Sequence, residues 1–266
     1  MNAFARLAVG ALALLTAAPA AAQGSSRTLV AVFAHADDES SASQVLARYA
    51  REGAQVYLII ATDGAAGGLR TSIPRGPELA RARREEARCA TDALGIRPPI
   101  FLDFPDGQLG AYVEDPSRLY RLTQRIHEEL QRLRPDVLIT WGPDRGTGHP
   151  DHRLVSDIVT QLVRAGAPGV PERLFYASLP IEAIRAVNPR GEPPFLIPQS
   201  KYFSVRVPFT PPDLEASVRS MACHRTQFND EMLTTAREGM PRILNGAVSF
   251  VPFVPVAAAT DVFPSR

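Results

Sequence analysis

The sequence contains almost no lysine and almost no excess of positive or negative charge. Lys201 is the only lysine among 29 basic residues, and 28 acidic residues leave a formal net charge of +1 over 266 residues. Proteins that bind nucleic acid or anionic membranes through general electrostatics carry a clear excess of positive charge. The composition therefore gives no case for either kind of partner.

Cysteine is also scarce. Cys89 and Cys223 are the only two cysteines, and they could form one disulfide in an oxidising compartment. The sequence cannot place them within bonding distance, and both fall in helix-like stretches. We therefore favour two buried thiols over a disulfide.

Long apolar runs are absent except at the N-terminus. Residues 1–23 have a short start with Arg6, an apolar core and small residues before Gln23, which is the layout of a secretory signal peptide. A membrane anchor is the alternative, but the run is short and rich in alanine for a bilayer span. We expect cleavage near Gln23, an exported chain that is periplasmic or secreted without stable membrane insertion, and one domain over residues 24–266.

Strand and helix patterns alternate along the rest of the chain. Expected strands are 28–34, 55–61, 100–102, 136–140, 174–177 and 202–207, and expected helices are 40–52, 78–94, 116–133, 150–164 and 211–227. This alternation predicts βαβ units in an α/β fold, a Rossmann-like three-layer sandwich with a mostly parallel sheet. We interpret the proline-rich residues 180–200 as an excursion from the sheet that could cover the site, and the tail after Pro241 as an extended arm.

The segment "AHADDES" follows the first expected strand and places His35, Asp37 and Asp38 where parallel sheets bind ligands. Capping of the next helix would explain one or two of the acids. It would not explain His35, nor two adjacent aspartates whose charges repel. A divalent cation held by His35 and Asp38, with Asp37 directed toward bound water, would explain the crowding.

The segment "GTGHPDHRLV" also follows an expected strand and opens a helix, with Pro150 at the first helical position. His149 and His152 flank that start. A capped helix with two surface histidines is the alternative. However, three of the five histidines in the chain, together with the paired aspartates, fall in two loops at one edge of the sheet. The two segments together therefore indicate a metal site.

Two histidines and one carboxylate with an open position for water describe a catalytic zinc site. Zinc polarises a carbonyl group and lowers the pKa of its bound water. Asp37 is then the expected general base, and the spare His149 could donate to an oxyanion or to a leaving nitrogen. Asp151 could hold the tautomer of His149. Iron(II) and cobalt would accept the same ligands.

Six segments together resemble the LmbE/PIG-L family of zinc N-deacetylases. "AHADDE" is similar to the family's AHPDDE signature, and "GHPDH" to its second signature. Weaker similarities are "TDGAAG", "RREEARCATDALGI", "FPDGQL" and "HRTQF". Ala36 stands where the family usually has proline, Ala65 where an acidic residue is common, and Thr226 where it has serine.

The resemblance implies an LmbE-like fold, one zinc ion and hydrolysis of an N-acetyl group, typically from an N-acetylglucosamine unit. Carried over by position, the metal ligands are His35, Asp38 and His152, and the base is Asp37. His149 is the acid or electrophilic partner of the base, and Asp151 orients His149. The substrate contacts are Arg83 and Asp106. An esterase or another amidase is the nearest alternative. A metal-dependent carbohydrate-binding protein without catalysis is a third. The sequence leaves the glycan and the oligomeric state open.

Overall fold

The computed structural model describes residues 27–143, 148–178 and 198–264. The predicted signal peptide and nearly all of the proline-rich segment 180–200 lie outside the described residues. Within those three ranges, no helix combines the length and the apolar character needed to cross a bilayer.

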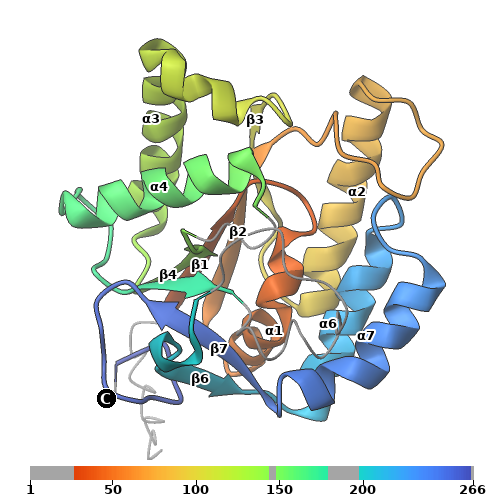
Figure 1. Ribbon diagram of the computed structural model, residues 1–266, viewed down its shortest axis with the longest axis vertical. Helices are drawn as coiled ribbons and strands as arrows, with labels where there is room; N and C mark the ends of the chain where they lie inside the picture. Colours follow the sequence, from red (N-terminus) through yellow and green to blue (C-terminus); the bar gives the residue numbers. More distant parts are fainter. Residues whose placement is uncertain (1–26, 144–147, 179–197, 265–266) are drawn as a thin grey trace, which may run out of the picture.

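Seven strands form one sheet in the order β3-β2-β1-β4-β5-β7-β6. Strands β1 to β5 pair in parallel, and β7 and β6 complete one edge with antiparallel pairing (Figure 1). The strand bounds are β1 Thr28–Phe33, β2 Gln55–Thr62, β3 Ile100–Phe104, β4 Val137–Trp141, β5 Leu174–Ala177, β6 Val205–Pro208 and β7 Ala247–Pro252. The predicted α/β class with a mostly parallel sheet is confirmed.

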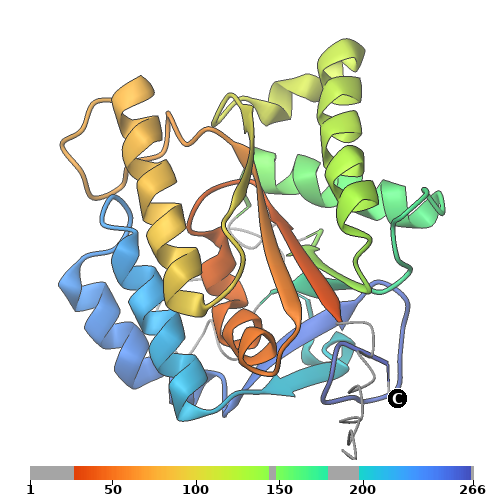
Figure 2. The same ribbon diagram turned by 180° about the vertical axis from the view of Figure 1, so that it is seen from behind.

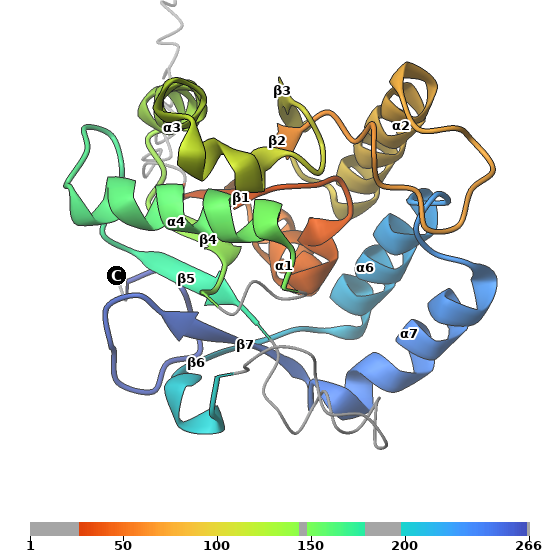
Figure 3. The ribbon, with the colours of Figure 1, turned by 45° about the horizontal axis from the view of Figure 1, so that its top comes forward.

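Helices cover both faces of the sheet (Figures 2 and 3). Their bounds are α1 Ser43–Arg51, α2 Pro77–Leu94, α3 Pro116–Leu133, α4 Pro150–Arg164, α6 Pro211–Cys223 and α7 Asp230–Ile243, with short 3₁₀ helices η1 Asp38–Ser41, η2 Leu109–Glu114 and η3 Ser200–Tyr202. Alternate side chains of β1 enter two separate cores. Leu29, Ala31 and Phe33 pack toward α1 and α2, whereas Val30 and Val32 pack toward α3 and α4. A strand buried on both faces explains its continuous apolar sequence.

The C-terminal region differs from the extended arm predicted after Pro241. Residues 247–252 form β7, which lies between β5 and β6 inside the sheet, and Val248 and Phe250 are buried on its core face. Helix α7 precedes it and contains Pro241 close to its end. The prolines suggested an irregular chain, but a proline near a helix end and another at a strand end disturb little pairing.

The topology reverses at β1, because β1 pairs with β2 on one side and with β4 on the other. The chain leaves β1 toward α1 on one face of the sheet and leaves β4 toward α4 on the opposite face. Parallel sheets bind ligands in the crevice outside the carboxyl ends of strands at such a reversal. Both histidine-bearing segments therefore begin at this point.

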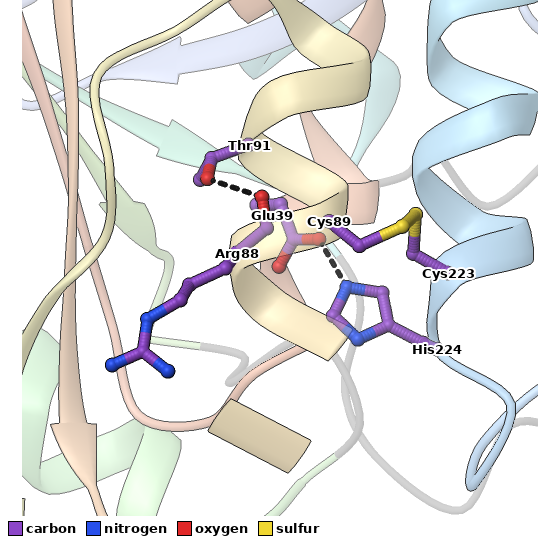
Figure 4. The surroundings of a disulfide bond; sticks show 6 residues. All are labelled: Glu39, Arg88, Cys89, Thr91, Cys223 and His224. Carbon is purple, nitrogen blue, oxygen red and sulfur yellow. Dashed lines mark hydrogen bonds and ion pairs between the residues drawn. A yellow bond between two sulfur atoms is a disulfide. The ribbon is translucent and has the colours of Figure 1, made fainter. Parts of the chain in front are cut away.

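A disulfide joins Cys89 of α2 to Cys223 at the end of α6, with a Cα–Cα distance of 5.7 Å (Figure 4). The interpretation of these cysteines as two buried thiols is wrong. Helices α2 and α6 pack side by side. No local pattern indicates this contact, because 134 residues separate the two cysteines.

Asp213 stabilises the start of α6 and its contact with α1. Its Oδ2 accepts hydrogen bonds from the amide (2.8 Å) and the hydroxyl (2.7 Å) of Thr210, and Arg51 donates to both of its oxygens at 2.9 and 3.1 Å. Burial alone would raise the pKa of Asp213, but the hydrogen bonds from Arg51 and Thr210 outweigh it and lower the pKa.

Replacing this carboxylate, as Asp213→Ala, should lower the free energy of unfolding by about 2 kcal/mol at pH 7. Because the folded pKa is depressed, this contribution is complete above the unfolded pKa of about 4 and is lost as pH falls through the folded pKa. Urea unfolding from pH 7 down to pH 3.5 measures the difference. An unchanged midpoint at pH 7 would contradict the assignment.

Candidate metal and catalytic site

The carboxyl end of β1 turns sharply and brings Asp38 back against the strand. Oδ2 of Asp38 accepts hydrogen bonds from the amides of Ala34 at 3.1 Å and His35 at 2.9 Å. Asp38 and His35 are each 7% exposed. A carboxylate that accepts two backbone bonds is held in its ionised form. Both side chains are thereby fixed inward, where β1 meets β4.

The end of β4 and the start of α4 supply the other histidines. His149 is the N-cap of α4, and its Nδ1 accepts a hydrogen bond from the amide of Asp151 at 3.1 Å. Since Nδ1 accepts, the proton of neutral His149 lies on Nε2. His152 lies in the first turn, and the ring of Trp141 stacks on it at 5.1 Å with an interplanar angle of 18°. Trp141 is 8% exposed, packs at the rim of the core and fixes the His152 ring.

Side-chain atoms of the three predicted ligand residues face one another. His35 Nδ1 and His152 Nε2 are 3.0 Å apart, His152 Nε2 and Asp38 Oδ1 are 3.1 Å apart, and His35 Nδ1 and Asp38 Oδ2 are 3.7 Å apart. Ligand atoms of tetrahedral zinc lie roughly 3.3 Å from one another at the usual zinc–ligand distances. The cluster of His35, His149 and His152 also has one ring nitrogen of each within 4.8 Å of the others. These residues fit a divalent metal ion.

The other nitrogen of His35 faces two buried carboxylates. Nε2 lies 3.1 Å from Oδ1 of Asp106 and 3.3 Å from Oδ2 of Asp151. Asp151 is fixed in turn by the amides of Gly107 at 2.8 Å and Leu109 at 2.9 Å. A proton on Nε2 leaves the lone pair of Nδ1 directed at the ligand cluster, the usual arrangement around a metal-binding histidine.

Charge around His35 is strongly negative. Burial alone would lower the pKa of His35, but hydrogen bonds to Asp106 and Asp151 and the charge of Asp38 outweigh it and raise the pKa to about 10. For Asp38, burial is likewise outweighed, by the charge and hydrogen bonding of His152, so its pKa is lowered. The site thus demands positive charge, which a proton or a cation between the ligand atoms can supply.

Asp37 stands beside this cluster in a constrained conformation. Its φ angle is 107°, which is uncommon for any residue other than glycine, and its amide donates a hydrogen bond to Oε2 of Glu39 at 3.0 Å. Burial raises the pKa of Asp37 to about 6 despite the opposing charge of Arg83. Its side chain keeps 24% of its surface exposed, so solvent and ligand can reach it.

Arg83 lies behind Asp37 and is 3% exposed. Its Nη2 donates to Oδ1 of Asp37 at 2.7 Å and to the carbonyl of Ala36. Gly67 leaves it room, because a Cβ there would lie 2.5 Å from Nη1 of Arg83. Oδ2 of Asp106 lies 3.6 Å from the same Nη1 and accepts the amide of Gly67 at 2.9 Å. Both predicted substrate contacts thus lie in the wall of the site, and their contact with substrate stays a prediction.

Asp151 and His149 meet through the backbone. The amide of Asp151 donates to His149, whereas its carboxylate contacts His35 and the η2 loop. Asp151 therefore orients two histidines by different groups. The carboxylate contact with His35 adds to the expected role, which concerned His149 alone.

The sequence analysis assigned no role to Glu39 and included His224 only within the "HRTQF" similarity. Both are fully buried, and Nε2 of His224 lies 2.6 Å from Oε1 of Glu39. Thr226 donates from its amide (2.8 Å) and its hydroxyl (2.7 Å) to Glu86 of α2. The "HRTQF" similarity was the only signal that this segment approaches the site.

Comparisons with known proteins agree with this geometry. A 1D-myo-inositol 2-acetamido-2-deoxy-α-D-glucopyranoside deacetylase from Corynebacterium urealyticum is 29% identical over 233 residues, which are 74% of this chain and 70% of that protein. A protein of the same name from Kineococcus radiotolerans is 35% identical over 173 residues, and the chain spans only 46% of its length. An N,N'-diacetylchitobiose deacetylase from Pyrococcus horikoshii has the same fold, with a TM-score of 0.62, 18% identity, and coverage of 86% of this chain and 84% of that one.

The family model for GlcNAc-PI de-N-acetylase, PIG-L, matches residues 30–163. That range is about half of the chain and contains most of β1, all of β4 and both histidine-bearing segments. The match therefore covers the strands that place the site as well as the residues within it. On this basis the chain belongs to the PIG-L family of de-N-acetylases.

Proposed function

We propose that this protein is a zinc-dependent hydrolase that removes the N-acetyl group from an N-acetylglucosamine-type amino sugar or glycoconjugate. The observation that carries the proposal is the cluster of ligand atoms from His35, Asp38 and His152, with Asp37 and His149 beside it. The names of the relatives support an amide bond as the target. Binding alone would require neither a base nor a proton donor.

Zinc held by these three residues would supply Lewis-acid activation of water and of the amide carbonyl. Asp37 accepts the proton of the attacking water. Its Oδ1 is held by Arg83, which leaves Oδ2 as the acceptor. The N–H at Nε2 of His149 donates a hydrogen bond to the oxygen of the tetrahedral species as its negative charge develops. When the C–N bond breaks, the amine nitrogen takes up the proton that Asp37 accepted from water, and acetate leaves.

Metal content is the first measurement of the site. The purified chain should hold about one zinc ion, and His152→Ala should lose it, because two protein ligands hold zinc poorly. His127→Ala is the matched control, since His127 lies on α3 and contacts the carbonyl of Pro168. Elemental analysis gives the result. A wild-type chain without metal after reconstitution with zinc would remove the basis of the proposal.

The base assignment is tested by Asp37→Asn. This variant should retain zinc and lose about 10²- to 10⁴-fold in kcat, the usual contribution of a general base. Release of acetate from N-acetylglucosamine and from its oligosaccharides measures the rate, and N-acyl and ester analogues of increasing chain length define the substrate. Turnover of the variant close to that of the wild type would exclude Asp37 as the base.

We also propose that the chain is exported. The Cys89–Cys223 disulfide supports this, because structural disulfides persist in oxidising compartments. The signal-like residues 1–23 agree with it. Intact-mass analysis of the periplasmic and secreted fractions should find a chain that begins near Gln23 and has no free thiol. A full-length chain with two free thiols, found only inside the cell, would contradict export.

A further inference from the structure

A hydrogen-bonded chain links the proposed base to the disulfide. The amide of Asp37 donates to Oε2 of Glu39 at 3.0 Å, and Nε2 of His224 donates to Oε1 of the same carboxylate at 2.6 Å. Cys223, the neighbour of His224, is bonded to Cys89 of α2. Figure 4 shows His224 directed at Glu39 directly beside the disulfide.

This hydrogen-bonded series of residues contacts the site at the amide of Asp37. A non-glycine residue with φ of 107° keeps that conformation only where its surroundings impose it, and such strain is concentrated at functional sites. Two bonds hold it here: Glu39 accepts the amide of Asp37, and the carbonyl of Asp37 accepts the amide of Ser40 at 3.0 Å. If the bond to Glu39 is lost, the turn can relax and the Asp37 carboxylate can move away from the ligand cluster while Asp38 keeps its own backbone bonds.

The burial of Glu39 and His224 also indicates that this pair has a role in the site. Both are 0% exposed, and a buried carboxylate is costly unless its oxygens are hydrogen-bonded. Each oxygen of Glu39 has one contact, with Asp37 and with His224. Among the described residues, Nδ1 of His224 has no hydrogen-bond partner, so the polar contact of the ring is its bond to Glu39. An apolar pair would fill this space at lower cost, which indicates a role beyond packing.

The disulfide fixes the position of His224. His224 directly follows the last residue of α6, where the chain leaves the helix. The covalent bond from Cys223 ties this helix end to α2, which also carries Arg83, the residue that holds the Asp37 carboxylate. His224, which holds Glu39 at the Asp37 amide, and Arg83, which holds the Asp37 carboxylate, are therefore connected through the Cys89–Cys223 disulfide.

We propose that Glu39 and His224 are positioning residues that hold Asp37 in its active conformation, and that the Cys89–Cys223 disulfide anchors them, so that catalytic turnover depends on the disulfide while metal binding does not. This rests on the proposed function, because it assumes that Asp37 is the base. Reduction by a phosphine breaks the S–S bond with two electrons and two protons. Two thiols form, and the phosphine takes up oxygen from water to become its oxide.

The positioning role is tested with Glu39→Ala and Glu39→Gln. Glu39→Ala should lower kcat by about 10²-fold, the cost of a misplacement near 1 Å, with KM within about threefold and zinc retained. Glu39→Gln should recover most of kcat, because its amide oxygen can accept from Asp37 and its amide nitrogen can donate to Nε2 of His224 in the tautomer that carries the proton on Nδ1. Asp213→Ala is the control, since it weakens the same helix layer away from Asp37. Equal kcat in Glu39→Ala and the wild type would overturn the proposal.

The disulfide is tested with the double variant Cys89→Ser/Cys223→Ser, assayed at a temperature where it is fully folded. Its kcat should fall about 3- to 10-fold with zinc content unchanged. Wild type treated with a phosphine should fall equally, and the double variant should not respond further. A phosphine is preferable to a dithiol, which would chelate the metal. If reduced wild type keeps its kcat, the disulfide has no part in positioning.

Hydrogen exchange separates this proposal from the proposed function, because it requires neither metal nor substrate. Peptides that contain Asp37 should exchange their amides faster in Glu39→Ala and in the double cysteine variant than in the wild type, and at an unchanged rate in Asp213→Ala. If the wild type has no deacetylase activity but the variants still differ from it in this way, the proposed function is rejected and the anchoring of Asp37 is retained. Unchanged exchange in all variants would reject the anchoring.

Discussion

The buried acids around His35 determine how this site is built. Asp38, Asp106 and Asp151 are each at most 7% exposed, and their oxygens lie 3.1 to 3.7 Å from the ring nitrogens of His35. Burying such carboxylates is costly unless hydrogen-bond donors or positive charge compensate it. Backbone amides supply part of this compensation at all three acids. Arg83, with Nη1 3.6 Å from Oδ2 of Asp106, adds positive charge, and a cation between the ligand atoms would add more.

The fold makes such a concentration of charge tolerable. At the reversal of strand order beside β1, the ends of β1 and β4 leave the sheet toward opposite helix layers. Free amides of loops and helix starts converge there, and they stabilise anionic groups. The loops after β2 and β3 add amides from Ala66, Gly67 and Gly107. Carboxylates that would be costly elsewhere in the interior thus accept hydrogen bonds from backbone amides at this edge.

Local patterns predicted the fold class and the grouping of His35, Asp38 and His152, because a buried strand followed by a polar turn is visible within a dozen residues. They could not predict which distant segments pack together. The disulfide spans 134 residues and the His224–Glu39 contact spans 185. Strand β7 was missed for the same reason, since its antiparallel partners β5 and β6 lie on either side of it in space and far from it in sequence.

The proposed metal ligands and the proposed base are held by different parts of the molecule. The ligand atoms are set by the ends of β1 and β4 and by the stacking of Trp141 on His152. Asp37 is held from the other side, at its carboxylate by Arg83 and at its amide by Glu39. A site divided in this way can lose alignment of the base without losing its metal. The two functions are therefore separable by substitution, although Asp37 and Asp38 are neighbours in the chain.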